Sequence, residues 1–271
     1  MNMTGAQAVL ECLQREGVDV VFGYPGGAVL TLYDELYKAE FPHILTGHEQ
    51  GAVHAADGYA RVTGRTGVCF ATSGPGVCNM VTGIATANMD SIPLVIISGQ
   101  VATPLIGRDS FQEADISGIT TPITKHNYLV KDVKELPRVL KEAFYIASTG
   151  RPGPVLVDIA KDVFDTSFEF EYPKDVHLRG YSGNQEGCQD DVVRAVKSLA
   201  KAKQPVLLTG GGVILSEMAE TLRTIVQPLG IPVVTTLMGK GSIPDDWDCH
   251  LGMVGMHGSY AANMAVTQCD L

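Results

Sequence analysis

The chain has 271 residues, of which 45% are hydrophobic and 18% charged, enough to bury a sizeable core over roughly two domains. Its net charge of −10 excludes nucleic acid and anionic membranes as main partners, because both require a basic surface. No basic stretch followed by an apolar core opens the chain, and no apolar run approaches the roughly 18 residues of a membrane span. The six cysteines form no CxxC pair and are typical of reduced, mostly buried thiols in a cytoplasmic protein.

Apolar runs of strand length alternate with helix-period segments along the chain. Most runs are continuous, which is typical of strands buried on both faces of a parallel sheet. The alternation predicts an α/β fold with a doubly wound parallel sheet and right-handed crossovers. The predicted strands are 18–23, 43–46, 67–72, 94–98, 155–159, 206–209 and 233–236. The predicted helices are 5–16, 29–38, 50–63, 76–89, 133–148, 190–202, 216–227 and 260–267.

The segment 166–189 interrupts this alternation. Its run Phe168-Glu169-Phe170-Glu171-Tyr172-Pro173 is charged and aromatic, ends in Pro, and is followed by several glycines. We therefore expect a first domain over 1–165, a linker over 166–189, and the start of a second α/β domain over 190–271. Cys269-Asp270-Leu271 indicates entry into a further strand, and an unpaired strand edge at a terminus is unusual, so we expect a truncated part of a longer protein.

A carboxylate, Glu49, stands where the predicted strand 43–46 meets the predicted helix 50–63. Strand-to-helix junctions of α/β sheets are where ligands usually bind. One interpretation is a solvated glutamate favoured by the helix dipole in the first turn. The other is a carboxylate held against apolar walls and ready for proton transfer.

Two Gly/Pro turns also follow predicted strands, at Gly23–Ala28 and at Thr72–Asn79. Their glycines allow the backbone to approach a ligand closely, and Thr, Ser and Asn side chains can bind its polar atoms. Each turn has a structural alternative: a tight connection for the first, and helix capping by Ser73 for the second. Ser73 is not in a GxSxG elbow, which argues against a hydrolase nucleophile.

Three further patterns are weaker. Phe111-Gln112 lies in a long loop, and long loops over α/β sheets often carry function. His48-Glu49 does not begin an HExxH zinc motif, because position 52 is Ala, and no metal site is expected in the chain. In the second domain, Gly210–Gly212, Thr236–Gly241 and Gly255–Gly258 follow strands and can line one nucleotide-binding crevice.

Taken together, these runs resemble the thiamine-diphosphate-dependent acetolactate synthase (acetohydroxyacid synthase) large subunit over essentially the whole chain. One departure is Ala160, where the family usually has Pro before Lys-Asp. The runs shared with the whole cofactor class are Gly23-Tyr24-Pro25-Gly26-Gly27, Gly47-His48-Glu49-Gln50-Gly51-Ala52, Ala56-Asp57-Gly58-Tyr59-Ala60-Arg61 and Thr72-Ser73-Gly74-Pro75-Gly76. The runs closer to the flavin-containing branch are Phe111-Gln112-Glu113, Arg151-Pro152-Gly153-Pro154-Val155, Lys161-Asp162 and Gly255-Met256-His257-Gly258.

The resemblance implies a pyrimidine-binding first domain and a Rossmann-like, FAD-binding second domain. It implies that Glu49 hydrogen-bonds the aminopyrimidine ring of thiamine diphosphate, which absorbs the electron pair when carbon dioxide leaves the substrate. The residues implied at the reaction centre are Glu49, Gln112, Lys161 and Phe111. Those implied around thiamine diphosphate are Tyr24, Pro25, Gly26, Thr72, Pro75 and Asn79. Those implied around FAD, which the family does not need for redox chemistry in its main reaction, are Arg151, Gly210, Gly211, Gly212, Thr236, Leu237, Met256 and His257.

The resemblance also implies a reaction and its partners. Pyruvate is decarboxylated and condensed with a second 2-keto acid to a 2-aceto-2-hydroxy acid, in branched-chain amino acid biosynthesis. The expected assembly is a homodimer or homotetramer in the cytoplasm, with a possible small regulatory subunit. The family's Gly-Asp-Gly motif, which binds Mg²⁺ and the diphosphate, is absent, so the isolated chain is expected to be inactive. The alternatives are a pyruvate oxidase, a 2-keto acid decarboxylase, or a non-catalytic fragment that only folds and dimerises.

Overall fold

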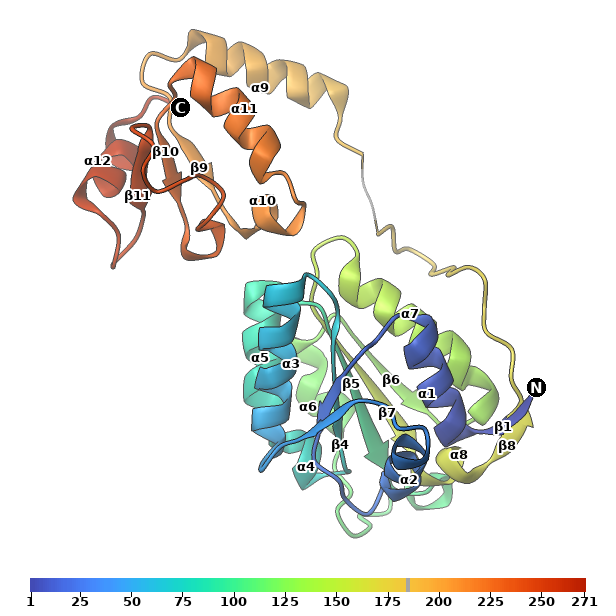
Figure 1. Ribbon diagram of the computed structural model, residues 1–271. Helices are drawn as coiled ribbons and strands as arrows, with labels where there is room; N and C mark the ends of the chain where they lie inside the picture. The colour runs from blue at the N-terminus through green and yellow to red at the C-terminus, as the bar shows by residue number, and fades with distance from the viewer. Residues whose placement is uncertain (184–185) are drawn as a thin grey trace. The chain divides into compact units, whose positions relative to one another are not determined.

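The computed structural model describes residues 1–183 and 186–271, and the chain forms two compact units, Met1–Gln185 and Glu186–Leu271 (Figure 1). In the first unit, six parallel strands form one sheet in the order β3-β2-β4-β5-β7-β6. Every residue of β5 and β7 is buried, as expected for central strands covered on both faces. The strands are β2 (Val21–Gly23), β3 (His43–Leu45), β4 (Gly67–Ala71), β5 (Leu94–Gln100), β6 (His126–Val130) and β7 (Pro154–Ala160).

Helices cover both faces of this sheet, which confirms the predicted α/β class with a parallel sheet. Helices α1 and α7 pack on one face and α3 and α5 on the other (Figure 1). The longer helices are α1 (Gly5–Arg15), α2 (Leu30–Lys38), α3 (Glu49–Thr63), α5 (Val81–Asp90) and α7 (Leu136–Ser148). The shorter ones are α4 (Pro75–Cys78), α6 (Ile116–Thr120), α8 (Lys161–Asp165), η1 (Thr103–Leu105), η2 (Thr121–Ile123) and η3 (Val133–Glu135).

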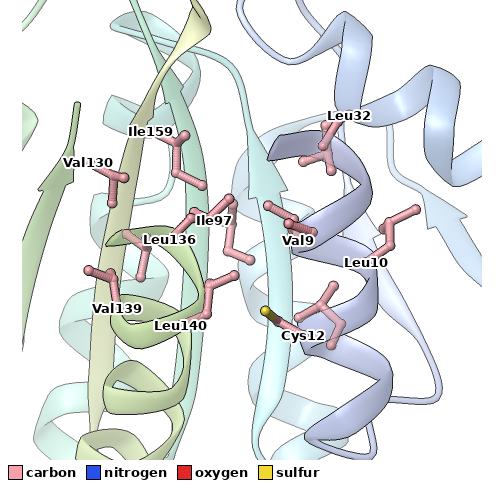
Figure 2. Packing of buried hydrophobic residues seen from close by; sticks show 14 of the residues in the cluster. Val9, Leu10, Cys12, Leu32, Ile97, Val130, Leu136, Val139, Leu140 and Ile159 are labelled. Carbon is pink, nitrogen blue, oxygen red and sulfur yellow. The ribbon is translucent and has the colours of Figure 1, made fainter. Parts of the chain in front are cut away.

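The largest core lies between α1, α7 and the sheet. Helix α1 starts at a capping box, in which Thr4 accepts from the Gln7 amide while the Gln7 side chain accepts from the Thr4 amide. Its apolar residues recur at helical spacing and turn toward the sheet. Figure 2 shows Val9 of α1 and Leu140 of α7 beside Ile97 of β5 in this core. Truncating one such buried leucine to Ala costs about 2–5 kcal/mol.

The predicted linker 166–189 is wrong at its beginning, because residues 167–172 belong to the first unit. Strand β8 (Ser167–Glu169) pairs antiparallel with β1 (Asn2–Thr4). Phe168 and Phe170 are buried, and the Phe170 ring stacks on Tyr172. The alternation of aromatic and acidic residues is therefore that of a half-buried strand, not of a linker. Residues 184–185 of the predicted linker lie outside the described residues.

The second unit contains three parallel strands in the order β11-β10-β9, around a small core of Val226, Val233 and Ile243. The strands are β9 (Leu207–Thr209), β10 (Val233–Thr235) and β11 (His250–Met253). The helices are α9 (Gln189–Lys201), α10 (Gly211–Leu215), α11 (Ala219–Leu229), η4 (Leu237–Gly239) and α12 (Tyr260–Gln268). Across both described parts of the chain, no helix has the length and apolar character that crossing a membrane requires.

Candidate functional site

The candidate site of the first unit lies where β2, β3 and β4 end. These strands are neighbours and parallel, so their carboxyl ends meet at one edge of the sheet. Tyr24 and Pro25 follow β2, Glu49 follows β3 and opens α3, and Thr72 follows β4. The fold thus brings together three segments that are far apart in the sequence.

Glu49 is buried at the first position of α3, with 8% of its surface exposed. Asn79, at the end of α4, donates from Nδ2 to Glu49 Oε2 over 3.0 Å. A Cβ added to Gly76 would lie 2.7 Å from Thr72 Cγ2 and 3.4 Å from the other carboxylate oxygen, Oε1, so Gly76 is required by packing against Thr72 and lies beside the carboxylate. His48 caps the helix, with its Nδ1 accepting from the Gln50 amide at 3.1 Å. A solvated first-turn glutamate does not fit this burial.

Thr72 holds the β2 and β4 turns together. Its Oγ1 accepts from the Ala28 amide at 3.2 Å, and a Cβ on Gly26 would lie only 2.5 Å from its own Cβ. Gly26 is therefore required by packing against Thr72, whatever ligand it contacts. The structural alternative for this turn, helix capping by Ser73, is wrong: Gly74 is the N-cap of α4 and Pro75 is its first residue.

The loop after β5 lies against the β4 turn. A Cβ on Gly74 would overlap the carbonyl oxygen of Gln112, so only glycine lets the two backbones approach this closely. Gly74 has φ +55° and Gln112 has φ +59°, both in the left-handed region. The structure thus brings Gln112 to the Thr72–Asn79 turn, while the neighbouring Phe111 ring is 87% exposed.

Lys161 and its neighbour Asp162 stand just after β7, at the same end of the sheet. Lys161 is exposed and opens α8. Asp162 Oδ1 accepts from the amide and the hydroxyl of Thr103, at 2.9 and 3.1 Å. Thr103 lies near the start of the loop that carries Gln112. The bonds from Thr103 to Asp162 therefore hold this end of the loop next to Lys161.

A buried polar network links β5 and β7 beneath this edge, and the sequence did not reveal it. Asp158 is 1% exposed; Ser98 Oγ donates to its Oδ1 at 2.6 Å and Gln100 Nε2 to its Oδ2 at 2.9 Å. Burial raises the pKa of the Asp158 carboxyl from its ordinary 3.8 to about 6, against the opposing effect of these two hydrogen bonds. The sequence signal for this network was the presence of Ser98, Gln100 and Asp158 in the otherwise apolar strands β5 and β7.

In the second unit, the predicted nucleotide-binding residues follow three adjacent parallel strands. Gly210–Gly212 follow β9, Thr236 and Leu237 follow β10, and Met256 and His257 come after β11. A Cβ on Gly212 would meet nothing within 4 Å, whereas one on Gly211 would lie 3.1 Å from Met238 Cβ. Open backbone at parallel strand ends fits a nucleotide-like ligand.

Arg151, also predicted to contact FAD, belongs to the first unit. Its Nε donates to Ser91 Oγ at 2.7 Å and its Nη2 to the Met89 carbonyl at 3.2 Å, at the end of α5. Among residues 1–183 and 186–271, no group of three or more His, Cys, Asp or Glu side chains is placed to hold a metal ion.

Comparisons with known proteins agree with this arrangement. Residues 3–119 match the thiamine pyrophosphate enzyme N-terminal TPP binding domain, and residues 192–271 match the thiamine pyrophosphate enzyme central domain. The whole chain is 57% identical to an acetolactate synthase of Mycobacterium bovis, covering 44% of that relative. It is 52% identical over 99% of its length to a probable acetolactate synthase large subunit of Methanocaldococcus jannaschii, covering 46% of that relative. It is 51% identical over its whole length to the acetolactate synthase large subunit of Haemophilus influenzae, covering 48% of that relative.

The chain thus spans less than half the length of the curated relatives it matches, at 44–48% for these three. Two successive family domains match in the order that the structure shows as two compact units. On these grounds the chain belongs to the thiamine pyrophosphate enzymes, and it matches the N-terminal part of acetolactate synthase large subunits.

Proposed function

We propose that the protein carrying this chain is an acetolactate synthase catalytic subunit. It decarboxylates pyruvate and joins the remaining two-carbon unit to a second 2-keto acid, giving a 2-aceto-2-hydroxy acid for branched-chain amino acid biosynthesis. The observation that carries the proposal is Glu49, buried and held by Asn79 where three parallel strands end. The identity of 57% to an acetolactate synthase over the whole chain supports the same reaction.

Glu49 is the residue that exchanges a proton with the cofactor's aminopyrimidine ring. Burial keeps water from competing for the carboxylate, and the Asn79 amide fixes its orientation. Oε1, the oxygen that Asn79 does not bind, is the one proposed to meet a ring nitrogen. Thiamine diphosphate, when bound, supplies the carbon nucleophile and accepts the electron pair released with carbon dioxide.

The residues around Glu49 have binding roles in this proposal. Tyr24, Pro25, Gly26, Thr72 and Pro75 line the cofactor, on turns that Thr72 ties together. Gln112 faces the cofactor from the loop that lies on Gly74, and Phe111 covers the substrate from the same loop. Lys161 offers an ammonium group to the carboxylate of a 2-keto acid.

The second unit is proposed to bind FAD, with Gly210, Gly211, Gly212, Thr236, Leu237, Met256 and His257 as contacts, and the FAD contact of Arg151 stays a prediction from the sequence. The open backbone at Gly212 supports this fit. Mg²⁺ and a homodimer or homotetramer belong to the same proposal, supported by the similarity to acetolactate synthase large subunits. A small regulatory subunit and a cytoplasmic location complete the proposal, and the free thiols of all six cysteines support a reducing compartment.

The test is Glu49→Gln in the full-length protein that carries this chain. Removing the proton-exchanging carboxylate is expected to lower acetolactate formation from pyruvate at least 100-fold, the usual range for general acid–base catalysis. Glu171→Gln, at an exposed position, is the matched control and keeps full activity. Wild-type turnover in Glu49→Gln contradicts its role. Acetyl phosphate or free aldehyde as the wild-type product, in place of acetolactate, contradicts the proposed reaction.

A further inference from the structure

The loop from Val101 to Asp115 joins β5 to α6 and carries Phe111 and Gln112. Beyond the short η1 it contains no helix or strand, so its shape depends on contacts made by individual side chains. Such a loop left to itself samples many conformations, each fixed residue costing about 1–2 kcal/mol in entropy. The contacts that hold it therefore decide where Phe111 and Gln112 lie.

The side chain of Gln100 holds the C-terminal end of this loop, and both its amide nitrogen and its amide oxygen make hydrogen bonds. Gln100 Nε2 donates both to Asp158 Oδ2, at 2.9 Å, and to the carbonyl of Ala114, at 3.3 Å. Gln100 Oε1 accepts from the Val101 amide at 2.9 Å. The amide thus bridges the buried carboxylate of β7 to a backbone group two residues beyond Gln112.

Asp158 makes this bridge rigid. It is almost fully buried, and Ser98 occupies its other oxygen at 2.6 Å, so the carboxylate cannot turn away from Gln100. Gln100 is itself buried, at 4% exposure, which keeps water from replacing either partner. Hydrogen bonds to a charged acceptor in such surroundings are stronger than neutral ones.

The carboxylates of Asp162 and Glu113 help to hold the remainder of the loop. Its beginning is held at Thr103 by Asp162, and its middle by Glu113, which accepts backbone N–H bonds from Gly107, Arg108 and Ser110. These bonds hold the pKa of Glu113 below its ordinary value. Gln112, next to Glu113 in this loop, has a left-handed backbone. This conformation costs about 1–2 kcal/mol for a residue with a side chain. The bond to Ala114 is one of the contacts that hold Gln112 in that conformation, together with Glu113 and the packing on Gly74.

We propose that Gln100 is a positioning residue for the Phe111-Gln112 loop, acting through the Ala114 carbonyl and anchored by Asp158. The inference rests on the proposed function, in which Gln112 faces the cofactor and Phe111 the substrate. In this proposal Gln100 does not contact the cofactor or the substrate. It fixes the position of the loop whose residues Phe111 and Gln112 contact them. Its effect is therefore on the placement of reacting groups, where an error of about 1 Å can lower a rate about 100-fold.

The first test is hydrogen exchange of the 271-residue chain, which needs no cofactor. Asp158→Asn is the reference, because the side-chain amide it introduces can accept from Gln100 while donating to the Ser98 hydroxyl. Gln100→Leu in the Asp158→Asn background removes the bonds to Ala114 and to the Val101 amide without leaving a buried carboxylate unpaired. Amides of 103–114 are expected to exchange at least tenfold faster in the double variant than in the reference, while β5 and β7 amides keep their rates.

Gln7→Leu serves as the matched control, since it removes a glutamine contact at the start of α1, away from the loop. It is expected to leave exchange of 103–114 unchanged. Equal loop exchange in the double variant and in the reference overturns the inference. General acceleration across β5 and β7 also overturns it, because Gln100 then supports the sheet and not the loop.

The second test is steady-state kinetics of the full-length protein with the same variants. The double variant is expected to lower kcat about tenfold relative to Asp158→Asn and to raise the KM for pyruvate, with an unchanged melting temperature. Unchanged kcat and KM together with a released loop overturn the positioning role, although the proposed reaction stands. If wild-type protein forms no acetolactate, the proposed reaction fails, and the exchange experiment still decides whether Gln100 anchors the loop.

Discussion

The strand-end clusters of the two units differ in how their residues are held. In the first unit, specific contacts hold them: Asn79 donates to Glu49, Thr72 accepts from the Ala28 amide, and Gly74 packs against the Gln112 backbone. In the second unit, Gly212 presents open backbone, since an added Cβ would meet nothing within 4 Å, and Leu237 and Met256 are 71% and 91% exposed. The difference teaches that residues of a functional motif can be fixed by contacts within their own unit, or can stay exposed and become ordered only by a ligand.

The largest expected effect comes from Gly74, in the packed cluster of the first unit. Gly74→Ala places a Cβ against the Gln112 carbonyl and forces alanine to φ +55°, so it is expected to destabilise the first unit by about 3 kcal/mol. Displacement of Gln112 is also expected to lower turnover of the full-length protein about 100-fold. Urea unfolding of the 271-residue chain, followed by hydrogen exchange in peptides of the first unit, measures the stability.

Gly212→Ala is the counterpart in the open cluster, where an added Cβ meets nothing within 4 Å. It is expected to change stability by less than about 0.5 kcal/mol. Trp247, the chain's single Trp, lies in the second unit and reports its unfolding by fluorescence. If Gly74→Ala and Gly212→Ala destabilise their units equally, the first cluster is not more tightly packed than the second at these positions.

The next expected effect is a dependence of unfolding free energy on pH that arises in the first unit and not from the buried polar pair of the second. The buried polar pair of the second unit, Thr209 and Ser242, consists of hydroxyls 3.0 Å apart that do not titrate near neutrality. In the first unit, burial raises the pKa of Asp158 to about 6. The folded protein then binds this proton more tightly than the unfolded chain does. The stability that protonation contributes is fully present below pH about 4 and is lost as the pH rises through about 6.

The shift corresponds to about 3 kcal/mol at most, and Asp158→Asn lacks this contribution at every pH. The unfolding free energy of Asp158→Asn relative to wild type is therefore expected to rise by up to about 3 kcal/mol between pH 4 and pH 7. Urea titrations at the two pH values measure it, with the exposed Asp175→Asn as the control. A difference that does not depend on pH contradicts the elevated pKa of Asp158.

The same contrast explains what the sequence could predict. Long apolar runs identified β4, β5 and β7, because strands buried on both faces carry that local pattern. Strands β1, β6, β8 and β11 were missed, since each is an edge strand of mixed composition whose identity depends on its partner. Glu49 could be placed from its junction between a strand and a helix.

The network beneath the site could not be predicted in the same way. Ser98 meets Asp158 only because β5 and β7 pair in the register that sets these two residues opposite one another. Register is a tertiary property, since a slip by one residue turns every side chain to the other face. The contact between Gln100 and Ala114 depends further on the path of a loop, which no local pattern specifies.

The smallest effect tests whether the first cluster is preorganised at its centre. Asn79→Leu keeps the volume of the side chain but removes the donor to Glu49 Oε2. A hydrogen bond to a charged group contributes about 1.5–3 kcal/mol, so loss of orientation is expected to lower kcat of the full-length protein about tenfold. Asn88→Leu, on α5, is the control and keeps kcat. If Asn79→Leu retains wild-type kcat, burial alone holds Glu49 in place, and the first cluster is preorganised by packing rather than by its hydrogen bonds.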